Sequence, residues 1–155
     1  MIEMPSVVGV FVNSKGGVPK HPVSSMTVKR DLIVEDAHTN TKNHGGPEKV
    51  VCILAETVLK ELRGKGHPIY AGSTGENLIL SDIQPHELDV GVTLKIGEVV
   101  LQITMPTTPC WKIESSFING DFSTFDHSNC PYQTRWYCRV ISTGLVEMNQ
   151  MVEIQ

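Results

Sequence analysis

The feature that most constrains the fold is a two-residue alternation of apolar and polar side chains in VTLKIGEVVLQIT, residues 92–104. The alternation stops at Gly97 and then resumes. Successive side chains of a strand point to opposite faces of a sheet, so each half of this segment has the pattern of a strand with one buried face. The segment is therefore predicted to form a β-hairpin with its turn at Gly97.

Other parts of the chain have the same strand character. They are rich in β-branched and apolar residues and are separated by turn-forming residues. These segments are VVGVFVN (7–13), SMTVKRDLIVED (25–36), GENLILS (75–81), RWYCRVIS (135–142) and MVEIQ (151–155). Many short strands between turns indicate a mainly β fold, either a barrel or a sandwich.

One stretch changes its period in mid-course. KVVCILA (49–55) is continuously apolar, as in a strand buried on both faces, whereas ETVLKELRGKG (56–66) has apolar residues at helical spacing. Glu56 and Lys60 form an i,i+4 pair on that helix. A single helix over 47–63 is the alternative, but the first part has no polar face, which favours a strand followed by a helix.

Length and charge narrow the class of protein. The chain has 155 residues, 40% of them hydrophobic, which favours one domain over residues 1–155. Its formal net charge is -4, and nucleic-acid binding usually needs a basic surface, so no nucleic-acid partner is expected. No window is long and apolar enough to span a bilayer, so no membrane partner is expected.

The start of the chain lacks the basic region and apolar run of a signal peptide, which predicts a cytoplasmic protein. Thiols stay reduced in that compartment. The four cysteines are therefore expected to be free, and they include no C-x-x-C pair of the zinc-ribbon or thioredoxin kind. They are Cys52, Cys110, Cys130 and Cys138.

The segment HGGPEK, residues 44–49, is a candidate anion site. Gly45 and Gly46 allow backbone N–H groups to approach an anion, Lys49 adds positive charge, and His44 can donate a hydrogen bond or titrate. The plainer alternative is a tight turn before a strand, which a glycine pair also favours.

The loop MPTTPCWK holds a candidate reactive thiol, Cys110. Pro109 fixes its own φ and biases Thr108 toward an extended conformation, so the loop is expected to be stiff. Lys112 is two residues on and lies on the same face of an extended segment, where a cation lowers a thiol pKa. A thiolate can bind a soft metal such as molybdenum or hold a transferable sulfur atom. The alternative is a small buried hydrophobic residue.

The segment RWYCRV predicts a strand with two different faces. Trp136 and Cys138 lie on one face, which is interpreted as core, so Cys138 is expected to be inert packing. Tyr137 and Arg139 lie on the other, where a guanidinium can bind phosphate through two hydrogen bonds. An ion pair between Arg139 and an acidic residue is the alternative.

The segment 117–134 has no clear period and is expected to be a long loop, a kind of segment that is often functional. His127 and Cys130 within it have the spacing of half a zinc site, but structural zinc usually needs two close ligand pairs, so zinc is not favoured. Cys52 lies in an apolar run and is interpreted as core. No G-x-S-x-G motif indicates a hydrolase.

Taken together, these segments resemble the MOSC domain, the C-terminal domain of molybdenum-cofactor sulfurases, which also occurs as small stand-alone bacterial proteins. The motifs follow in the expected order over nearly the whole chain. They are SKGGVPK (14–20), HGGPEKVV (44–51), GENL (75–78), LKIGEVVLQIT (94–104) leading into TPCWK (108–112), and RWYCRVISTG (135–144).

The resemblance implies a distorted β-barrel of the MOSC or pyruvate-kinase type, with one or two short helices. It implies that Cys110 is the functional cysteine. In amidoxime-reducing components the matching cysteine ligates molybdenum, and other members have been proposed to carry sulfur as a persulfide. The family is also joined to pyridoxal-phosphate-dependent cysteine desulfurases. This chain is too short to contain such a domain, so pyridoxal phosphate would belong to a partner.

The resulting expectation is a site in which Cys110 acts with sulfur or with a pyranopterin-bound molybdenum. The cofactor phosphate would lie near Gly45 and Gly46, beside His44, with Lys49 and Arg139 countering its charge. Lys112 would help to keep Cys110 ionised.

Three functions remain open. A sulfur carrier would receive sulfur from a cysteine desulfurase and pass it to a metal–sulfur or molybdoenzyme acceptor. A molybdenum-dependent reductase would act on N-hydroxylated compounds. A binding module without catalytic activity would use the 117–134 loop.

Overall fold

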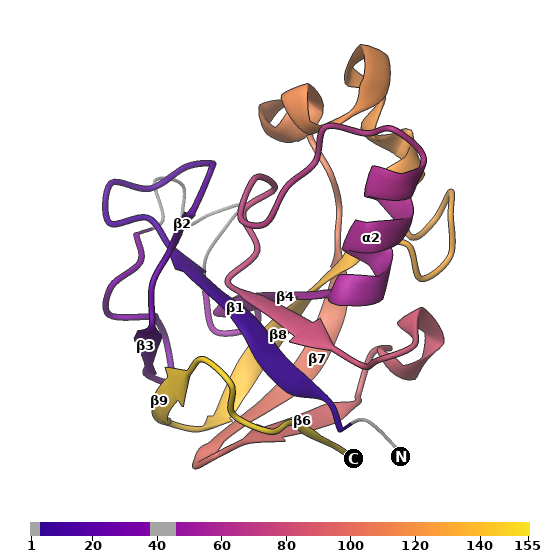
Figure 1. The fold of residues 1–155 in the computed structure, drawn as a ribbon. Helices are drawn as coiled ribbons and strands as arrows, with labels where there is room; N and C mark the ends of the chain where they lie inside the picture. Colours follow the sequence, from indigo (N-terminus) through magenta and orange to yellow (C-terminus); the bar gives the residue numbers. More distant parts are fainter. Residues whose placement is uncertain (1–3, 38–45) are drawn as a thin grey trace.

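The computed structural model describes residues 4–37 and 46–155. Within these residues the chain forms a strand-rich fold (Figure 1). The strands are β1 (Ser6–Val12), β2 (His21–Pro22), β3 (Ser25–Val28), β4 (Val51–Ala55), β5 (Leu78–Ser81), β6 (Thr93–Ile96), β7 (Val99–Thr107), β8 (Arg135–Ser142), β9 (Gly144–Glu147) and β10 (Glu153–Ile154). The helices are α2 (Glu56–Gly64) and the short 3₁₀ helices η1 (Pro85–Glu87), η2 (Trp111–Ser116), η3 (Ile118–Gly120) and η4 (Phe122–Phe125).

Most of the strands form one eight-stranded sheet in the order β10-β6-β7-β8-β4-β5-β1-β2, and β3 pairs with β9 in a separate ribbon. The named pairings of these sheets are antiparallel except that of β4 with β5, which is parallel. The parallel pair requires a crossover connection, and α2 is part of it.

The main sheet is distorted and does not close into a barrel through a continuous strand ladder. Its outer strands, within the described residues, are β10 and β2. β1 approaches the chain before β10 through an isolated bridge between Ser6 and Met151, and the Val7 amide donates to the Gln150 carbonyl at 2.9 Å. The predicted mainly β, distorted-barrel fold class is confirmed, in a form whose sheet stays open.

The change of period after residue 55 marks the start of the helix. All five residues of β4 are buried between β5 and β8. α2 begins directly after β4 and buries Val58, Leu59 and Leu62, the residues at helical spacing. A strand followed by a helix is therefore confirmed over a single helix.

The hairpin predicted over 92–104 is confirmed as β6 and β7, with Gly97 in the turn at a φ of 60°. The segment 25–36 is not one extended strand. It turns back after β3, so that Val28 bridges Ile33 and the Lys29 amide donates to the Leu32 carbonyl at 2.8 Å. The polar residues after Val28 form this turn, which interrupts the apolar pattern.

The segment after Cys110 folds into η2, η3 and η4, which lie together at one end of the sheet (Figure 1, orange). Ile113, Phe117 and Phe125 from this segment are buried in the core. Helices of three to six residues are too short to show a period, which explains why 117–134 had the pattern of a loop. Across residues 4–37 and 46–155, none of the helices has the length and apolarity that crossing a bilayer requires.

Candidate functional site

Three neighbouring strands form the floor of a pocket. Cys52 of β4 is paired in register with Tyr137 of β8, and Thr107 of β7 with Arg135 of β8. Side chains of paired residues lie on the same face of a sheet, and residues 135 and 137 of one strand share a face. The strand register therefore places these four side chains on one side of the sheet, opposite the core residue Trp136.

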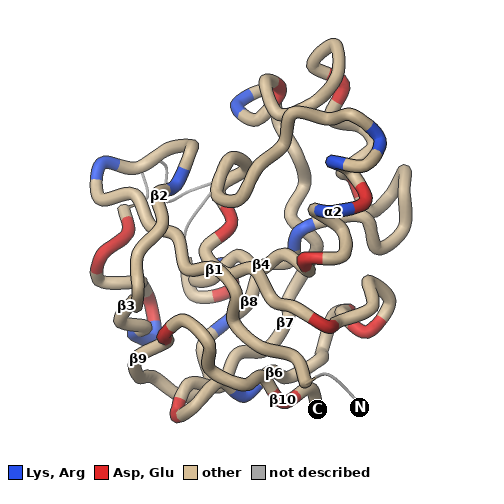
Figure 2. Tube along the Cα trace, viewed as in Figure 1, with Lys and Arg blue, Asp and Glu red and all other residues tan. Residues whose placement is uncertain are grey.

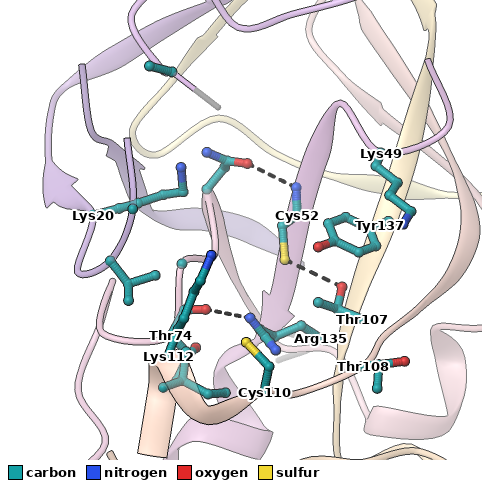
Figure 3. A pocket seen from close by; sticks show the side chains of 16 residues that line it. Lys20, Lys49, Cys52, Thr74, Thr107, Thr108, Cys110, Lys112, Arg135 and Tyr137 are labelled. Atoms are coloured by element: carbon teal, nitrogen blue, oxygen red, sulfur yellow. Dashed lines mark hydrogen bonds between the residues drawn. The ribbon is translucent and has the colours of Figure 1, made fainter. Parts of the chain in front are cut away.

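The pocket is a cavity of about 110 Å³ above this floor (Figure 3). Its other walls are the loop before β5, the loop after β1, and the start of η2. The lining side chains with polar or ionisable atoms are Lys20, Lys49, Cys52, Thr74, Asn77, Thr107, Thr108, Cys110, Lys112, Arg135 and Tyr137.

Cys110 lines this cavity and is half-buried. The chain leaves β7 at Thr107 and reaches Cys110 in an extended conformation, with φ −143° and ψ 174°, just before η2 begins. Lys112, within η2, also lines the cavity, and Figure 3 shows its side chain extending into it. The predicted proximity of Cys110 and Lys112 to one site is thus present, although a 3₁₀ turn and not an extended segment produces it.

Arg135 is the site residue that the sequence reasoning missed. Its exposed fraction is only 6%, and a guanidinium N–H donates to the Thr74 carbonyl. Its Cζ lies 5.2 Å from the centroid of the Phe125 ring. Its Nε has no hydrogen-bond partner among the described residues. The same alternation that placed Tyr137 and Arg139 on one face could have identified it.

Arg139 does not line this cavity. Its side chain is 48% exposed, donates to the Gln102 side-chain oxygen, and lies 3.9 Å from a Glu48 carboxylate oxygen. Four residues of a strand span about 13 Å, so Arg139 lies well away from Arg135 although both point to the same face. The alternative interpretation of Arg139, an ion pair with an acidic residue, matches its surroundings.

Only part of the HGGPEK segment can be placed. His44 and Gly45 lie outside the described residues. Gly46 is exposed in a turn with φ 95°, a left-handed conformation that favours glycine, and the Lys49 amide donates to its carbonyl at 3.1 Å. Lys49 lines the cavity, and its Nζ lies 5.5 Å from the centroid of the Tyr137 ring.

The GENL motif holds the loop on one side of the cavity. The carboxylate of Glu76 is fully buried and accepts hydrogen bonds from the Gly72 amide at 2.8 Å and the Thr74 hydroxyl at 2.6 Å. Burial raises the pKa of Glu76 above its usual value. Because Arg135 donates to the Thr74 carbonyl, Glu76 indirectly fixes the position of the guanidinium.

Lys20 contributes a cation whose charge is already balanced. Its Nζ lies 2.6 Å from a carboxylate oxygen of Asp36, whose side chain is fully buried. Asp36 also accepts hydrogen bonds from the Asn13 amide and the Asn77 side chain. Asn77 in turn accepts a hydrogen bond from the Cys52 amide at 3.0 Å. This network stabilises the cavity wall.

Two thiols line the cavity in different surroundings. Cys52 is 5% exposed, and its sulfur lies 3.6 Å from the Thr107 hydroxyl. Burial raises the pKa of Cys52, against the opposing effects of Arg135 and of the hydrogen bond to Thr107. Cys110 is the more accessible of the two. Cys52 was interpreted as core, but its side chain faces the cavity.

Cys138 and Tyr137 confirm the two predicted faces of β8. Cys138 is fully buried in the core, and burial raises its pKa well above the usual value. Its interpretation as packing is confirmed. Tyr137 lies on the cavity side, and burial raises its pKa to about 12, with smaller effects from Cys52 and Cys110.

No three His, Cys, Asp or Glu side chains converge as a metal site within the part of the chain that the structure describes. His127 instead accepts a hydrogen bond at Nδ1 from the Tyr132 amide at 2.8 Å and packs edge-on against Trp136.

Comparison with known proteins identifies the family. The MOSC domain model matches residues 40–153. The chain belongs to the MOSC domain family. Among curated relatives, it is 29% identical over 140 residues to the uncharacterized protein YflK of Bacillus subtilis, and 25% identical over 123 residues to protein YiiM of Escherichia coli. These matches cover 89% and 77% of this chain, but only 62% and 54% of the relatives.

A third relative carries a functional name. The chain is 29% identical over 90 residues to a protein of Gibberella moniliformis named reductase. The match covers 55% of this chain and 16% of that protein.

Solved structures support the fold. The crystal structure of the YUAD protein of Bacillus subtilis has a TM-score of 0.76 at 16% identity, covering 97% of this chain and 96% of that one. The structure of YiiM from Escherichia coli has a TM-score of 0.70 at 20% identity, covering 99% and 70%. The MOSC fold is thus established for this chain.

Proposed function

We propose that this MOSC protein uses Cys110 as a reactive thiol in a cationic pocket, to carry sulfur as a persulfide, to bind the molybdenum cofactor, or both. The observation that carries the proposal is the placement of Cys110 on the same cavity as a buried arginine with an unpartnered Nε. Lys112 and Lys49 line the same cavity.

The chemistry of a sulfur carrier suits this site. A thiolate is the form of cysteine that attacks sulfur, and a persulfide on Cys110 would keep one negative charge. Arg135 and Lys112 would stabilise that charge through charge-assisted hydrogen bonds. In this proposal the donor is a cysteine desulfurase that brings its own pyridoxal phosphate, and the acceptor is a metal–sulfur or molybdoenzyme in the cytoplasm.

The residues present also fit the molybdenum cofactor. A thiolate suits a soft metal, so Cys110 would be the protein ligand to molybdenum. Arg135, rather than Arg139, lines the cavity and would meet the cofactor phosphate together with Lys49 and Lys112. His44, Gly45 and Gly46 precede Lys49 in the sequence, and they remain proposed contacts of the cofactor phosphate. The bound cofactor would supply two-electron redox chemistry.

A second candidate is a molybdenum-dependent reductase of N-hydroxylated compounds. The relative named reductase favours it. It would use the same residues, with Cys110 as the metal ligand.

The test is the molybdenum and pterin content, together with the intact mass, of protein purified from a host that makes the cofactor. Wild type is compared with Cys110→Ser and with Cys130→Ser, a half-buried cysteine outside the cavity. Molybdenum that is lost only in Cys110→Ser supports cofactor binding. A dithiothreitol-removable gain of one sulfur mass, lost only in Cys110→Ser, supports the carrier.

If neither metal nor sulfur is found, the protein is better described as a binding module without catalytic activity. The 117–134 segment would then be its contact surface.

A further inference from the structure

The guanidinium of Arg135 lacks the partners that a buried cation normally has. Its side chain is more than nine-tenths buried, yet its Nε has no hydrogen-bond partner and it forms no ion pair within the described residues. The nearby Glu76 carboxylate is already engaged by Gly72 and Thr74. Within the described residues its hydrogen bond goes to a neutral carbonyl, that of Thr74, and no carboxylate pairs with it. A buried cation is costly unless a counter-charge lies against it, which indicates that an anion can complete this site.

The lining of the cavity favours a small anion with more than one negative charge. Arg135, Lys49 and Lys112 line it, together with the Asp36-paired Lys20, and no acidic side chain does so in the described chain. Over the rest of the molecule, basic and acidic positions are interspersed (Figure 2). The lining of the cavity is therefore cationic in a protein whose net charge is -4.

Size and hydrogen-bonding groups narrow the class of anion further. A cavity of about 110 Å³ has room for several water-sized groups. The Thr108 hydroxyl lies in the lining beside the cations, whereas the Thr74 hydroxyl donates to Glu76 and the Thr107 hydroxyl lies 3.6 Å from the Cys52 sulfur. A small cavity lined by cations suits a compact oxoanion.

The position of Cys110 would allow a bound anion to react with its thiol. In Figure 3 the Cys110 side chain points toward the Arg135 side chain, and both residues line the cavity. A small oxoanion held by Arg135 would therefore lie beside the thiol. If that anion carries a sulfur atom bonded to its oxidised centre, the thiol can take the sulfur directly.

We propose that the pocket binds a small sulfur oxoanion, represented by thiosulfate, and that Cys110 takes its outer sulfur. The inference rests on the sulfur-carrier proposal above and names the class of donor. The Cys110 thiolate attacks the outer sulfur of thiosulfate, and a new S–S bond forms. The bond between that sulfur and the sulfonate centre breaks, and sulfite leaves with the electron pair. The products are a Cys110 persulfide anion and one sulfite, with charge and electrons balanced and no added oxidant.

Arg135 has a defined part in this reaction. Its guanidinium, which lines the cavity, and the lysines would hold the sulfonate oxygens, on which the leaving electron pair accumulates. Lys112 lies at the mouth and is exposed, so it can draw the anion in from solvent. Sulfate has the same charge and a fourth oxygen in place of the transferable sulfur, so it should occupy the site and block the reaction.

The experiment incubates the reduced protein with thiosulfate and follows intact mass and released sulfite. We expect a gain of one sulfur mass and one equivalent of sulfite, located at Cys110 by peptide mapping and absent in Cys110→Ser. Arg135→Gln should slow loading at least ten-fold. Arg139→Gln is the matched control on the same face of β8, outside the cavity, and should load like wild type. Circular dichroism of each variant establishes that it is folded. If Arg135→Gln does not fold, Arg135→Lys replaces it in the loading experiment.

A second arm offers sulfur from a cysteine desulfurase with cysteine. Loading by the desulfurase but not by thiosulfate overturns the thiosulfate inference and leaves the carrier proposal standing. Loading by neither overturns both. Loading by thiosulfate that sulfate does not inhibit, or that Arg135→Gln does not slow, overturns the role given to the anion site. Sulfate-inhibited loading by thiosulfate supports the inference whatever the desulfurase does.

Discussion

Strand β8 carries two arginines on one face, and their surroundings are opposite. Arg135, at the start of the strand, is buried beside Thr74 and Phe125 and faces the cavity. Arg139, four residues on, is half-exposed and contacts Gln102 and Glu48. The first has an unpartnered Nε, and the second lies among polar surface groups.

The different surroundings of Arg135 and Arg139 show that residue type and strand face do not by themselves define a binding site. The position along the strand decides how deeply a side chain is buried. β7 pairs with the start of β8, and the 72–77 loop contacts Arg135 there, so its guanidinium is buried. A buried guanidinium attracts an anion more strongly than one that is fully exposed to water. The two arginines therefore serve as test and control for one another.

The largest expected effect is the loss of stability on substituting a residue on the core face of β8. Trp136 is 1% exposed in the core, so Trp136→Ala should lower the free energy of unfolding by about 3–5 kcal/mol. Trp111, which is 68% exposed beside Cys110, is the matched control, and Trp111→Ala should change stability by less than about 0.5 kcal/mol. Urea unfolding followed by circular dichroism measures both. Equal effects would mean that the two faces of β8 are wrongly assigned.

The next effect concerns the affinity for sulfate. A hydrogen bond to a charged group contributes about 1.5–3 kcal/mol, so Arg135→Gln should weaken sulfate binding by roughly 10- to 100-fold. Isothermal titration calorimetry at low ionic strength measures the affinity. Arg139→Gln should bind sulfate as wild type does. The comparison between the two arginines breaks down if both substitutions weaken binding equally.

A smaller effect follows from the carboxyl that orders the loop around Arg135. Burial raises the pKa of Glu76 above 4.5, its ordinary value, so the folded state holds the proton more tightly than the unfolded state. The stability that Glu76 contributes through this shift is fully present below the unfolded pKa and is lost as pH rises through the folded pKa. Wild type should therefore gain stability relative to Glu76→Gln as the pH is lowered from 8 toward 4.5.

Urea unfolding at a series of pH values measures that difference. Glu61→Gln is the control, since Glu61 is 63% exposed in a surface pair with Lys65. Its difference from wild type should change little over the same range. A difference for Glu76→Gln that does not change with pH would contradict the assignment of a raised pKa.

Much of the fold follows from local sequence patterns. The alternation over 92–104 predicts the β6–β7 hairpin, and the change of period at residue 56 predicts α2. The sheet order and its open edge do not follow, because they depend on pairings between distant strands such as β4 with β8. The three 3₁₀ helices after Cys110 are equally hidden, because each is shorter than the pattern that would reveal it.

The site was predictable only in part. Cys110, Lys112 and Lys49 line the cavity, as the site expected from their motifs requires. Arg135 was missed because it is the first residue of a strand. The sequence does not show which other segments bury a side chain at that position. Cys52 was assigned to the core because it lies in a continuously apolar run. Such a run does not show which of its side chains face a cavity instead of the core. Alternation along β8 puts Arg135 on the face of Tyr137, but the register with Thr107 and Tyr137 was needed to place Arg135 and Cys52 at one cavity.

The central claim is that Cys110 is an accessible thiol beside an anion site built around Arg135. The most direct test compares the rate of Cys110 alkylation by iodoacetate, an anion, with that by iodoacetamide, which is neutral, at one pH. Peptide mapping separates Cys110 from Cys130, which is also half-buried. We expect the ratio of the iodoacetate rate to the iodoacetamide rate to fall several-fold in Arg135→Gln and to stay unchanged in Arg139→Gln. An unreactive Cys110 in the native protein, or the same ratio in all three proteins, would contradict it.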